Sequence, residues 1–320
     1  METKHLKSFL KIADTGSISR AAESLGIAQP SLSQQLLRLE DELKFSLFRR
    51  TARGVTLTEA GRIFQEHARA ILRNTELAIE DVRELTTEPS GTVIMAVPYS
   101  ISKLAGVALI EAFLEHAPQI NFRLDEAFTG QIRGWLDLGK IDIGILHDLG
   151  PLRHLSSRRL ASEELFLIGP AGLYGTLGDM PDVEAASLSG LPMILPGRPH
   201  GLRQLIEHET MRLGVSLTVR LDIDAMGHIA DLVAAGHGYS ILPLPAAADA
   251  LAAGKISIAR IAHGALRRTL CLVRNSTQLV THASVRCEDL TIKVLAGLIE
   301  AGKWRAELDE ALRASLSSYA

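Results

Sequence analysis

The sequence predicts a helical N-terminal domain, then one long amphipathic helix, and then a larger domain of the α/β class. Three observations lead to this prediction. Short helical patterns joined by a tight turn fill the first 50 residues, apolar residues recur at heptad spacing as far as residue 85, and short apolar strands alternate with helices after residue 91. Such alternation is typical of parallel sheets with helices on their faces.

Length and composition are those of a globular protein with two or three domains. The chain has 320 residues, 47% hydrophobic and 22% charged, and a formal net charge of −3. Its apolar runs are too short to span a membrane, and its polar N-terminus lacks the apolar segment of a signal peptide. Two distant cysteines form no disulfide framework, and the histidines lack the spacing of a zinc site. We therefore expect a cytoplasmic protein without a metal, a cofactor or a membrane partner.

Residues 17–43 have the pattern of a helix-turn-helix. Ser17 or Ser19 can cap a helix. Gly26 has the backbone freedom that a tight turn needs, and Pro30 suits the first turn of the following helix, where a missing N–H costs little. The buried stripe of that helix is expected to be Leu32, Leu36, Leu39 and Leu43. A helix-turn-helix places its second helix in the DNA major groove, so this stretch predicts DNA binding.

Two further patterns follow before residue 91. Residues 48–58, with Gly54 at the tip, predict a two-stranded wing. Apolar positions in steps of four and three then form a heptad seam at Phe64, Ala68, Ile71, Thr75, Ala78, Val82 and Leu85. This spacing, with charges on the other faces, favours a dimerising helix over a single helix packed on its own domain. The breaker at residues 88–91 is a candidate hinge.

The α/β region is expected to hold nine strands and five helices. The strands are expected at 92–97, 120–126, 141–146, 165–169, 192–195, 219–224, 239–242, 256–261 and 267–274. The helices are expected at 102–116, 130–138, 201–213, 227–235 and 278–300, with a loosely attached helical tail at 303–320.

Spaced positions across residues 21–61 match a known pattern. They are Ala21, Ala22, Leu25, Gln29, Pro30, Ser31, Leu32, Ser33, Leu39, Glu40, Leu43, Leu47, Phe48, Arg50, Val55, Leu57, Thr58, Ala60 and Gly61. This set resembles the N-terminal signature of LysR-type transcriptional regulators. Residues 139–145 and 233–243 more loosely resemble the effector domain of that family, and residues 27–30 and 53–61 are most similar to its nitrogen-assimilation regulator subgroup.

One position departs from the pattern. Lys44 stands where the family usually has Gly at the end of the recognition helix. A left-handed cap would cost lysine about 1 kcal/mol, unless the helix end shifts.

The resemblance implies a fold of the α + α/β class. It consists of a winged helix-turn-helix domain (1–58), a dimerising linker helix with a hinge (59–90), a two-subdomain α/β effector-binding domain like a periplasmic binding protein (91–302) and a C-terminal tail (303–320). Subdomain I would hold residues 91–162 and 268–302, and subdomain II residues 163–267, with crossings near 160–164 and 265–270.

The resemblance also implies a function. The chain would be a sequence-specific DNA-binding transcriptional regulator, paired through its linker helix as a homodimer and further as a homotetramer. Its partners would be double-stranded DNA with a near-palindromic operator and a small polar or anionic effector that modulates DNA binding or bending. An effector-independent regulator is the alternative within the family, and a solute-binding protein or an α/β enzyme the alternative outside it. The sequence has no nucleophile elbow, phosphate-binding loop or zinc-protease motif, so we do not expect an enzyme.

Residues that contact DNA are expected on the exposed face of the third helix and in the wing. They are Gln29, Pro30, Ser31, Ser33, Gln34, Arg38, Arg50 and Arg53. Glutamine amides address adenine edges and serine hydroxyls either bases or phosphates, while arginines near the wing pair with phosphates. Gln34, Gln35 and Arg38 have a simpler alternative role as a solvated helix face.

Residues that bind the effector are expected at strand C-termini and helix N-termini, where backbone N–H groups favour anions and polar groups. They are Pro98, Ser100, Ile101, Ser102, Thr129, His147, Arg198, His200, Met226 and His228. Ser100 and Ser102 could equally be helix caps, and His147 or His200 ordinary surface histidines.

Overall fold

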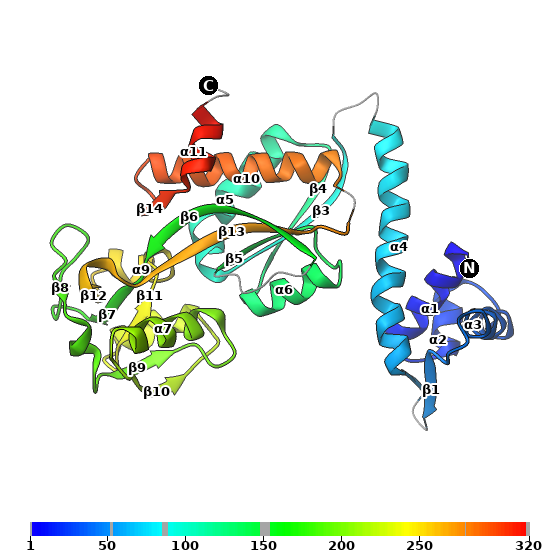
Figure 1. Cartoon of the computed structure of the whole chain (residues 1–320), viewed down its shortest axis with the longest axis horizontal. Coiled ribbons are helices and arrows are strands. Elements are labelled where there is room, and N and C mark those ends of the chain that lie inside the picture. The colour runs from blue at the N-terminus through cyan, green and yellow to red at the C-terminus, as the bar shows by residue number, and fades with distance from the viewer. Residues whose placement is uncertain (1, 52–53, 85–88, 148–153, 279, 318–320) are drawn as a thin grey trace. The chain divides into compact units, whose positions relative to one another are not determined.

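The computed structural model describes residues 2–51, 54–84, 89–147, 154–278 and 280–317. The chain forms two compact units, one of residues 1–87 with 278–281 and one of the remainder, and each is described by itself (Figure 1). None of the helices formed by the described residues combines the length and apolar character needed to cross a membrane.

The first unit contains the expected helix-turn-helix, wing and long helix. Its elements are α1 (Thr3–Thr15), α2 (Ile18–Leu25), α3 (Gln29–Leu43), β1 (Phe48–Thr51), β2 (Gly54–Leu57) and α4 (Glu59–Glu84). The Ser17 side chain accepts a hydrogen bond from the Arg20 N–H and so caps α2. Gly26 ends α2 with φ 65°, the left-handed conformation that the turn requires. Local sequence therefore determines where these helices begin and end.

Apolar packing and one carboxylate fix the wing against the helices. The Phe9 ring lies 5.2 Å from the Phe48 ring and 5.0 Å from the Phe64 ring, which joins α1, β1 and α4. The Glu40 carboxylate on α3 accepts hydrogen bonds from the N–H groups of Leu47 (2.6 Å) and Phe48 (3.2 Å). The start of the wing is thus tied to the second helix of the helix-turn-helix.

The heptad seam is described only in part. Ala68 is buried in the core of the first unit, whereas Ile71 is 39% exposed and Thr75 is exposed. The side chains at positions 78 and 82, and residue 85 altogether, lie outside the described part of the chain. The seam therefore begins in the domain core and emerges at the surface of the single chain.

The second unit contains two subdomains, each built on its own sheet. The strands of the six-stranded sheet, in spatial order, are β14 (Ala306–Leu308), β6 (Leu155–Glu164), β13 (Arg267–Asn275), β5 (Ile143–His147), β3 (Gly91–Val97) and β4 (Ile120–Glu126). The four-stranded sheet has the order β11 (Ser240–Leu242), β7 (Phe166–Pro170), β12 (Ile256–Ile261) and β8 (Asp182–Val183). β9 (Pro192–Leu195) and β10 (Thr218–Asp222) form a parallel pair.

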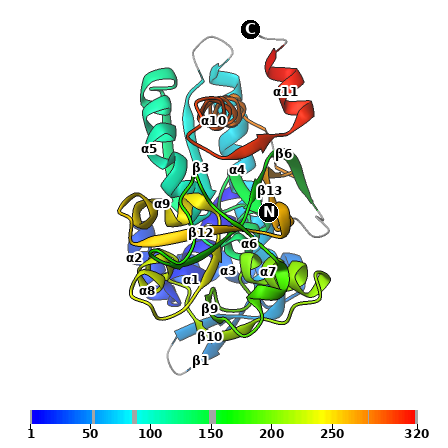
Figure 2. The ribbon, with the colours of Figure 1, turned by 90° about the vertical axis from the view of Figure 1, so that its left-hand side faces the viewer.

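Helices cover both faces of the six-stranded sheet. α5 (Tyr99–His116) and α10 (His282–Glu300) lie on one face and α6 (Thr129–Asp137) on the other (Figure 2). Alternate side chains of β13 point to opposite faces of the sheet. Leu270 and Leu272 pack with α5 and α10 on one face, and Cys271 and Val273 pack with α6 on the other. The second subdomain carries α7 (Gly201–Arg212), α8 (Gly227–Ala234) and α9 (Leu244–Ala252).

The six-stranded sheet is mixed, whereas the alternation of strands and helices suggested parallel pairing. β3 pairs in parallel with β4 and β5, but β13 is antiparallel to both β5 and β6. The physical reason is that β6 leads out of the first subdomain and β13 returns from the second, so the two run in opposite directions. β6 ends at Glu164 and β13 begins at Arg267, within the ranges expected for the two crossings.

The C-terminal segment is not the loosely attached tail that its sequence suggested. Trp304 is 2% exposed, and β14 adds to the edge of the sheet by pairing with β6. α11 (Glu310–Ser317) then buries Leu312 against the same core. Helix α9 was missed by the sequence analysis, and α5 begins at Tyr99 because Pro98 is its N-cap residue.

The end of α3 yields a stability prediction. Lys44 has φ 61°, so the departure from glycine places a side chain in a left-handed cap. We expect Lys44→Gly to raise the free energy of unfolding by about 1 kcal/mol, because glycine adopts the left-handed conformation without strain. Losing the exposed ion pair of Lys44 with Asp41 should offset little of this gain. Urea denaturation of the full chain measures this difference. Lys44→Ala is the control, since it also loses the ion pair but keeps a Cβ. An equal gain in both variants would contradict the prediction.

Candidate functional site

The face of α3 that is expected to contact DNA is open to solvent. Gln29, Pro30, Ser31, Gln34 and Arg38 are exposed, and Ser33 is half-buried. The Gln29 Nε2 donates to the Ser33 Oγ at 3.4 Å, while none of the described residues pairs with the Arg38 guanidinium. Recognition of a DNA groove needs exposed polar side chains at the start of a helix that are available to bond to bases and phosphates.

Three other residues near this face need separate mention. Gln35, which was expected to be exposed, is half-buried and accepts a 2.7 Å hydrogen bond from the Ser8 Oγ, so it joins α3 to α1. Arg50 lies in β1, but its side chain is outside the described part of the structure, as is Arg53 altogether. The Arg49 Nε, also on the wing, donates to the Thr56 Oγ1 at 3.0 Å.

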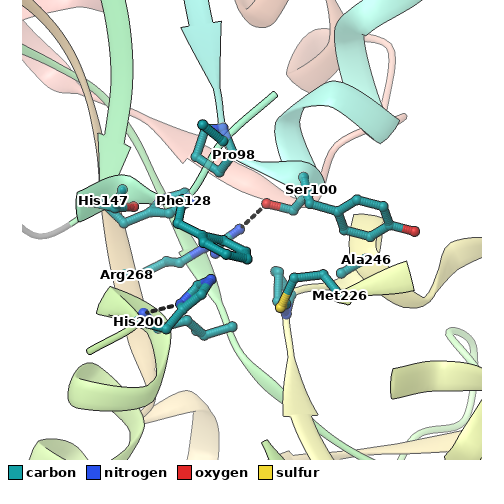
Figure 3. Close-up of a pocket in the computed structure, with 13 residues that line it drawn as sticks. Pro98, Ser100, Phe128, His147, His200, Met226, Ala246 and Arg268 are labelled. Carbon is teal, nitrogen blue, oxygen red and sulfur yellow. Dashed lines mark hydrogen bonds between the residues drawn. The ribbon is translucent and has the colours of Figure 1, made fainter. Parts of the chain in front are cut away.

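A cavity between the two subdomains of the second unit brings together most of the expected effector residues. Its lining residues come from both subdomains and are Pro98, Tyr99, Ser100, Ala127, Phe128, Thr129, His147, His200, Leu202, Met226, Pro243, Ala246 and Arg268 (Figure 3). The free volume is about 20 Å³, which is space for one or two water molecules. We call it the inner cavity.

A second, wider cavity adjoins the first and shares Tyr99, Ala127, Phe128 and Met226 with it. It has a volume of about 280 Å³, and its other lining residues are Glu126, Gln131, Asp224, Ala225, Gly227 and His228. We call it the outer cavity. His228, one of the expected effector residues, lies here and not in the inner cavity.

Arg268 is the dominant charge of the inner cavity. It is 3% exposed and stands opposite Glu163 in the register of β13 and β6. Its Nε and Nη2 donate to the Glu163 Oε1 at 2.8 and 2.6 Å, and its Nη2 also donates to the Ser100 Oγ at 2.7 Å. The other Glu163 oxygen accepts from the Trp304 Nε1 at 2.9 Å. The pair thus connects both crossing strands, the first turn of α5 and the C-terminal segment.

Two histidines in this cavity are held neutral. Burial lowers the pKa of His147 well below its usual value, and the Arg268 guanidinium lowers it further. Burial lowers the pKa of His200 to about 4, opposed by the nearby Asp224 carboxylate. The His200 Nδ1 accepts from the Leu202 N–H at 3.1 Å, so in the neutral ring the proton is on Nε2. The Phe128 ring packs edge-to-face with this ring, with 4.8 Å between centroids.

His147 differs from His200 because its ring nitrogens make no hydrogen bond to the described residues. It ends β5, is 5% exposed, and neither of its ring nitrogens has a hydrogen-bond partner among the described residues. Leaving a buried donor unsatisfied costs about 1–3 kcal/mol. A side chain that lines a cavity and carries such a cost is typical of a binding site.

Five helices begin at the inner cavity. The lining residues include the first turns or N-caps of α5, α6, α7, α8 and α9. Each helix N-terminus carries a partial positive charge and unpaired N–H groups. These N-termini favour negative charge in the inner cavity, where the charge of Arg268 itself is balanced by Glu163.

The structure does not bring every expected effector residue to a cavity. Ile101 is fully buried in the core of the first subdomain, and Ser102 is half-buried on the first turn of α5 without lining either cavity. Arg198 is exposed and pairs with Glu207 at 2.8 Å. Sequence reasoning missed Arg268, although two adjacent arginines at the start of an apolar strand were a usable signal.

Comparisons with known proteins agree with this architecture. Residues 3–62 match the family described as "Bacterial regulatory helix-turn-helix protein, lysR family" and residues 86–292 match "LysR substrate binding domain". The chain is 29% identical to the nitrogen assimilation regulatory protein nac of Escherichia coli over 307 residues, covering 95% of this chain and 99% of that protein. It is 30% identical to the nac protein of Klebsiella aerogenes over 273 residues, covering 85% and 88%.

Solved structures show the same fold. A full-length OxyR variant from Pseudomonas aeruginosa superposes with a TM-score of 0.71 at 22% identity, covering 92% of this chain and 94% of that one. Full-length CbnR complexed with its target DNA superposes with a TM-score of 0.65 at 22% identity, covering 92% and 100%.

The buried ion pair yields a prediction. We expect Arg268→Met to destabilise the protein by about 3–5 kcal/mol, because Glu163 would remain as a buried, uncompensated charge. The double variant Arg268→Met/Glu163→Gln should recover part of this loss, because glutamine is uncharged and still accepts from Trp304. Urea denaturation compares the two. A double variant no more stable than the single one would show that loss of packing, not of charge pairing, is the cause.

The neutral histidines yield a pH prediction. An unfolded chain protonates His200 below about pH 6.5, while the folded chain does so only near its pKa of about 4. Folding stability therefore falls as pH drops through this range. His200→Asn keeps an acceptor for the Leu202 N–H and should reduce the loss between pH 7.5 and 5.5 by on the order of 1 kcal/mol. Denaturation at both pH values measures it, and identical losses in wild type and variant would contradict the assignment.

Proposed function

Because this chain belongs to the LysR family of bacterial transcriptional regulators, we propose that α3 reads a near-palindromic operator and that a small polar or anionic effector in the cavities of the second unit modulates DNA binding or bending. The first unit is a DNA-binding helix-turn-helix domain, and the second is the effector domain of the family. The protein is a regulator and not an enzyme, and since it acts on DNA we place it in the cytoplasm.

The observation that carries the DNA assignment is the exposed polar face of α3. Gln34 and Arg38 project from a helix whose opposite face is buried, and the first turn presents Ser31 with N–H groups that suit a phosphate. Gln34 is our candidate for base reading. Arg50 and Arg53 are our candidates for phosphate contacts near the wing, which position the protein without reading sequence.

Two apolar surfaces support an assembly of several copies. Ile71 and Thr75 leave the heptad seam of α4 exposed, as a dimerising helix requires. On α5, Val107, Ile110 and Leu114 are also exposed, at spacings that place them on one face. We propose that α4 pairs two copies and that the α5 face joins pairs into a homotetramer. Residues 1–58 would bind DNA, 59–90 would pair copies and 91–302 would bind the effector.

The crossing strands suggest how the effector acts. β6 and β13 join subdomains whose facing loops line the inner cavity. A ligand held by both subdomains favours one angle between them over others. In a tetramer this change would alter the spacing of the DNA-binding domains, and so DNA bending more than affinity.

An effector-independent regulator remains the second candidate. It is favoured by the 20 Å³ volume of the inner cavity, which is small for a metabolite.

DNA recognition is tested on an operator selected from random duplexes with the wild-type protein. We expect Gln34→Ala to reduce the preference for this operator over scrambled DNA by about 5- to 100-fold, the value of one bidentate base contact. Arg53→Ala should weaken binding to both sequences alike. Gel shifts at one fixed salt concentration measure both effects. Unchanged preference in Gln34→Ala would remove its base-reading role, and a selected operator without two half-sites would remove the paired arrangement.

A further inference from the structure

The two adjoining cavities have opposite electrostatic character. The inner cavity is lined by Arg268, two neutral histidines and five helix N-termini. The outer cavity is lined by the carboxylates of Glu126 and Asp224. Its one basic side chain among the described residues is His228, which lies 3.9 Å from the Asp231 carboxylate. A ligand that spans both cavities therefore meets helix N-termini and a paired arginine in the inner cavity and two carboxylates in the outer cavity.

The inner cavity has the donors that a carboxylate needs. The Ser100 Oγ accepts from Arg268, which leaves its own O–H available to donate. A neutral His147 ring has one N–H donor, and neither of its nitrogens is used by the described residues. These groups come from the start of α5, the end of β5 and β13, and Figure 3 shows Ser100, His147 and Arg268 around the same space.

Size decides among anions. About 20 Å³ accommodates one or two water-sized atoms, which matches the two oxygens of a planar carboxylate. A phosphate or sulfate, with four oxygens in a tetrahedron, needs more room. The remainder of the ligand must lie in the outer cavity, past Phe128 and Met226, which line both spaces.

The outer cavity favours a cation. The Asp224 Oδ1 accepts from the Gly197 N–H at 3.0 Å, which holds the carboxylate in place and leaves its other oxygen for a ligand. Glu126 ends β4 beside Tyr99; burial raises the pKa of that phenol, and the Glu126 carboxylate adds to the shift. Both carboxylates are exposed, so an ammonium group that pairs with them keeps part of its hydration.

We propose that the effector is a small zwitterion of the amino-acid class, with its carboxylate in the inner cavity at Ser100, His147 and Arg268 and its ammonium in the outer cavity at Glu126 and Asp224. This inference rests on the proposed effector-dependent function. The outer cavity, at about 280 Å³, has room for the ammonium group and for an amino-acid side chain.

The test uses the full-length wild-type chain and three sets of probes. The zwitterions are glycine, L-alanine, L-serine, β-alanine and γ-aminobutyrate, the acids are acetate, propionate and butyrate, and the amines are ethylamine and propylamine. Thermal unfolding at matched ionic strength measures binding, since a ligand selective for the folded state raises the melting temperature. We expect at least one zwitterion to raise it, with an affinity about tenfold above that of any acid or amine.

Variants separate the two halves of the site. Glu126→Gln/Asp224→Asn keeps the shape and an acceptor for the Gly197 N–H, and it should weaken the bound zwitterion about tenfold while leaving acid binding unchanged. His147→Leu should weaken zwitterion and acid together. Glu111→Gln, an exposed carboxylate on α5 away from both cavities, is the matched control and should change neither.

Each remaining outcome counts against the proposal. Equal affinity for acids and zwitterions would mean that the carboxylates of Glu126 and Asp224 remain in solvent and do not bind the ammonium group. No shift with any probe, in a protein that still selects its operator, would overturn the zwitterion and leave the regulatory function standing. A wild-type protein that selects no operator at all would instead overturn the proposed mode of DNA recognition.

Discussion

The ion pair between Arg268 and Glu163 is the interaction on which the effector domain depends. Both charges are buried, and they face each other on the antiparallel strands that join the two subdomains. Because a buried charge is costly without a partner, the pair fixes the relative register of β6 and β13 at the crossing. Its remaining hydrogen bonds reach Ser100 at the start of α5 and Trp304 in the C-terminal segment. The geometry of the inner cavity is thereby set by the same contacts that hold the domain together.

At the junction between subdomains, the buried guanidinium of Arg268 is balanced by Glu163, and five helix N-termini add partial positive charge. Burial keeps His147 and His200 neutral, and the Arg268 guanidinium lowers both pKa values further. None of the described residues bonds to the ring nitrogens of His147, so a ligand that bonds to them would offset the cost of burying them. A ligand in a cavity at a junction of this kind would bias the angle between the two subdomains directly, since the lining residues belong to both.

The DNA-binding unit differs from the effector domain in that the bounds of its helices are set mostly by neighbouring residues in the sequence. A serine cap, a left-handed glycine and an N-terminal proline set the helix ends, and apolar residues at helical spacing form the core. Long-range contacts then orient the wing, through Glu40 on the backbone of residues 47–48 and through the three packed phenylalanines. Lys44 shows that one unfavourable cap is tolerated where this packing is sufficient.

The sequence by itself determined the helix-turn-helix and most strands of the second unit, because periodicity, caps and turns are local properties. The ranges in which β6 ends and β13 begins followed from its resemblance to the LysR family. The sequence also placed Pro98, Ser100, Thr129, His147, His200 and Met226 in loops that meet at one cavity. Only the tertiary structure decided the antiparallel course of β13, the burial of Trp304 and the role of Arg268. Each of these depends on partners more than 100 residues away, on Glu163 above all, and no local pattern encodes the pairing of two charges across such a distance.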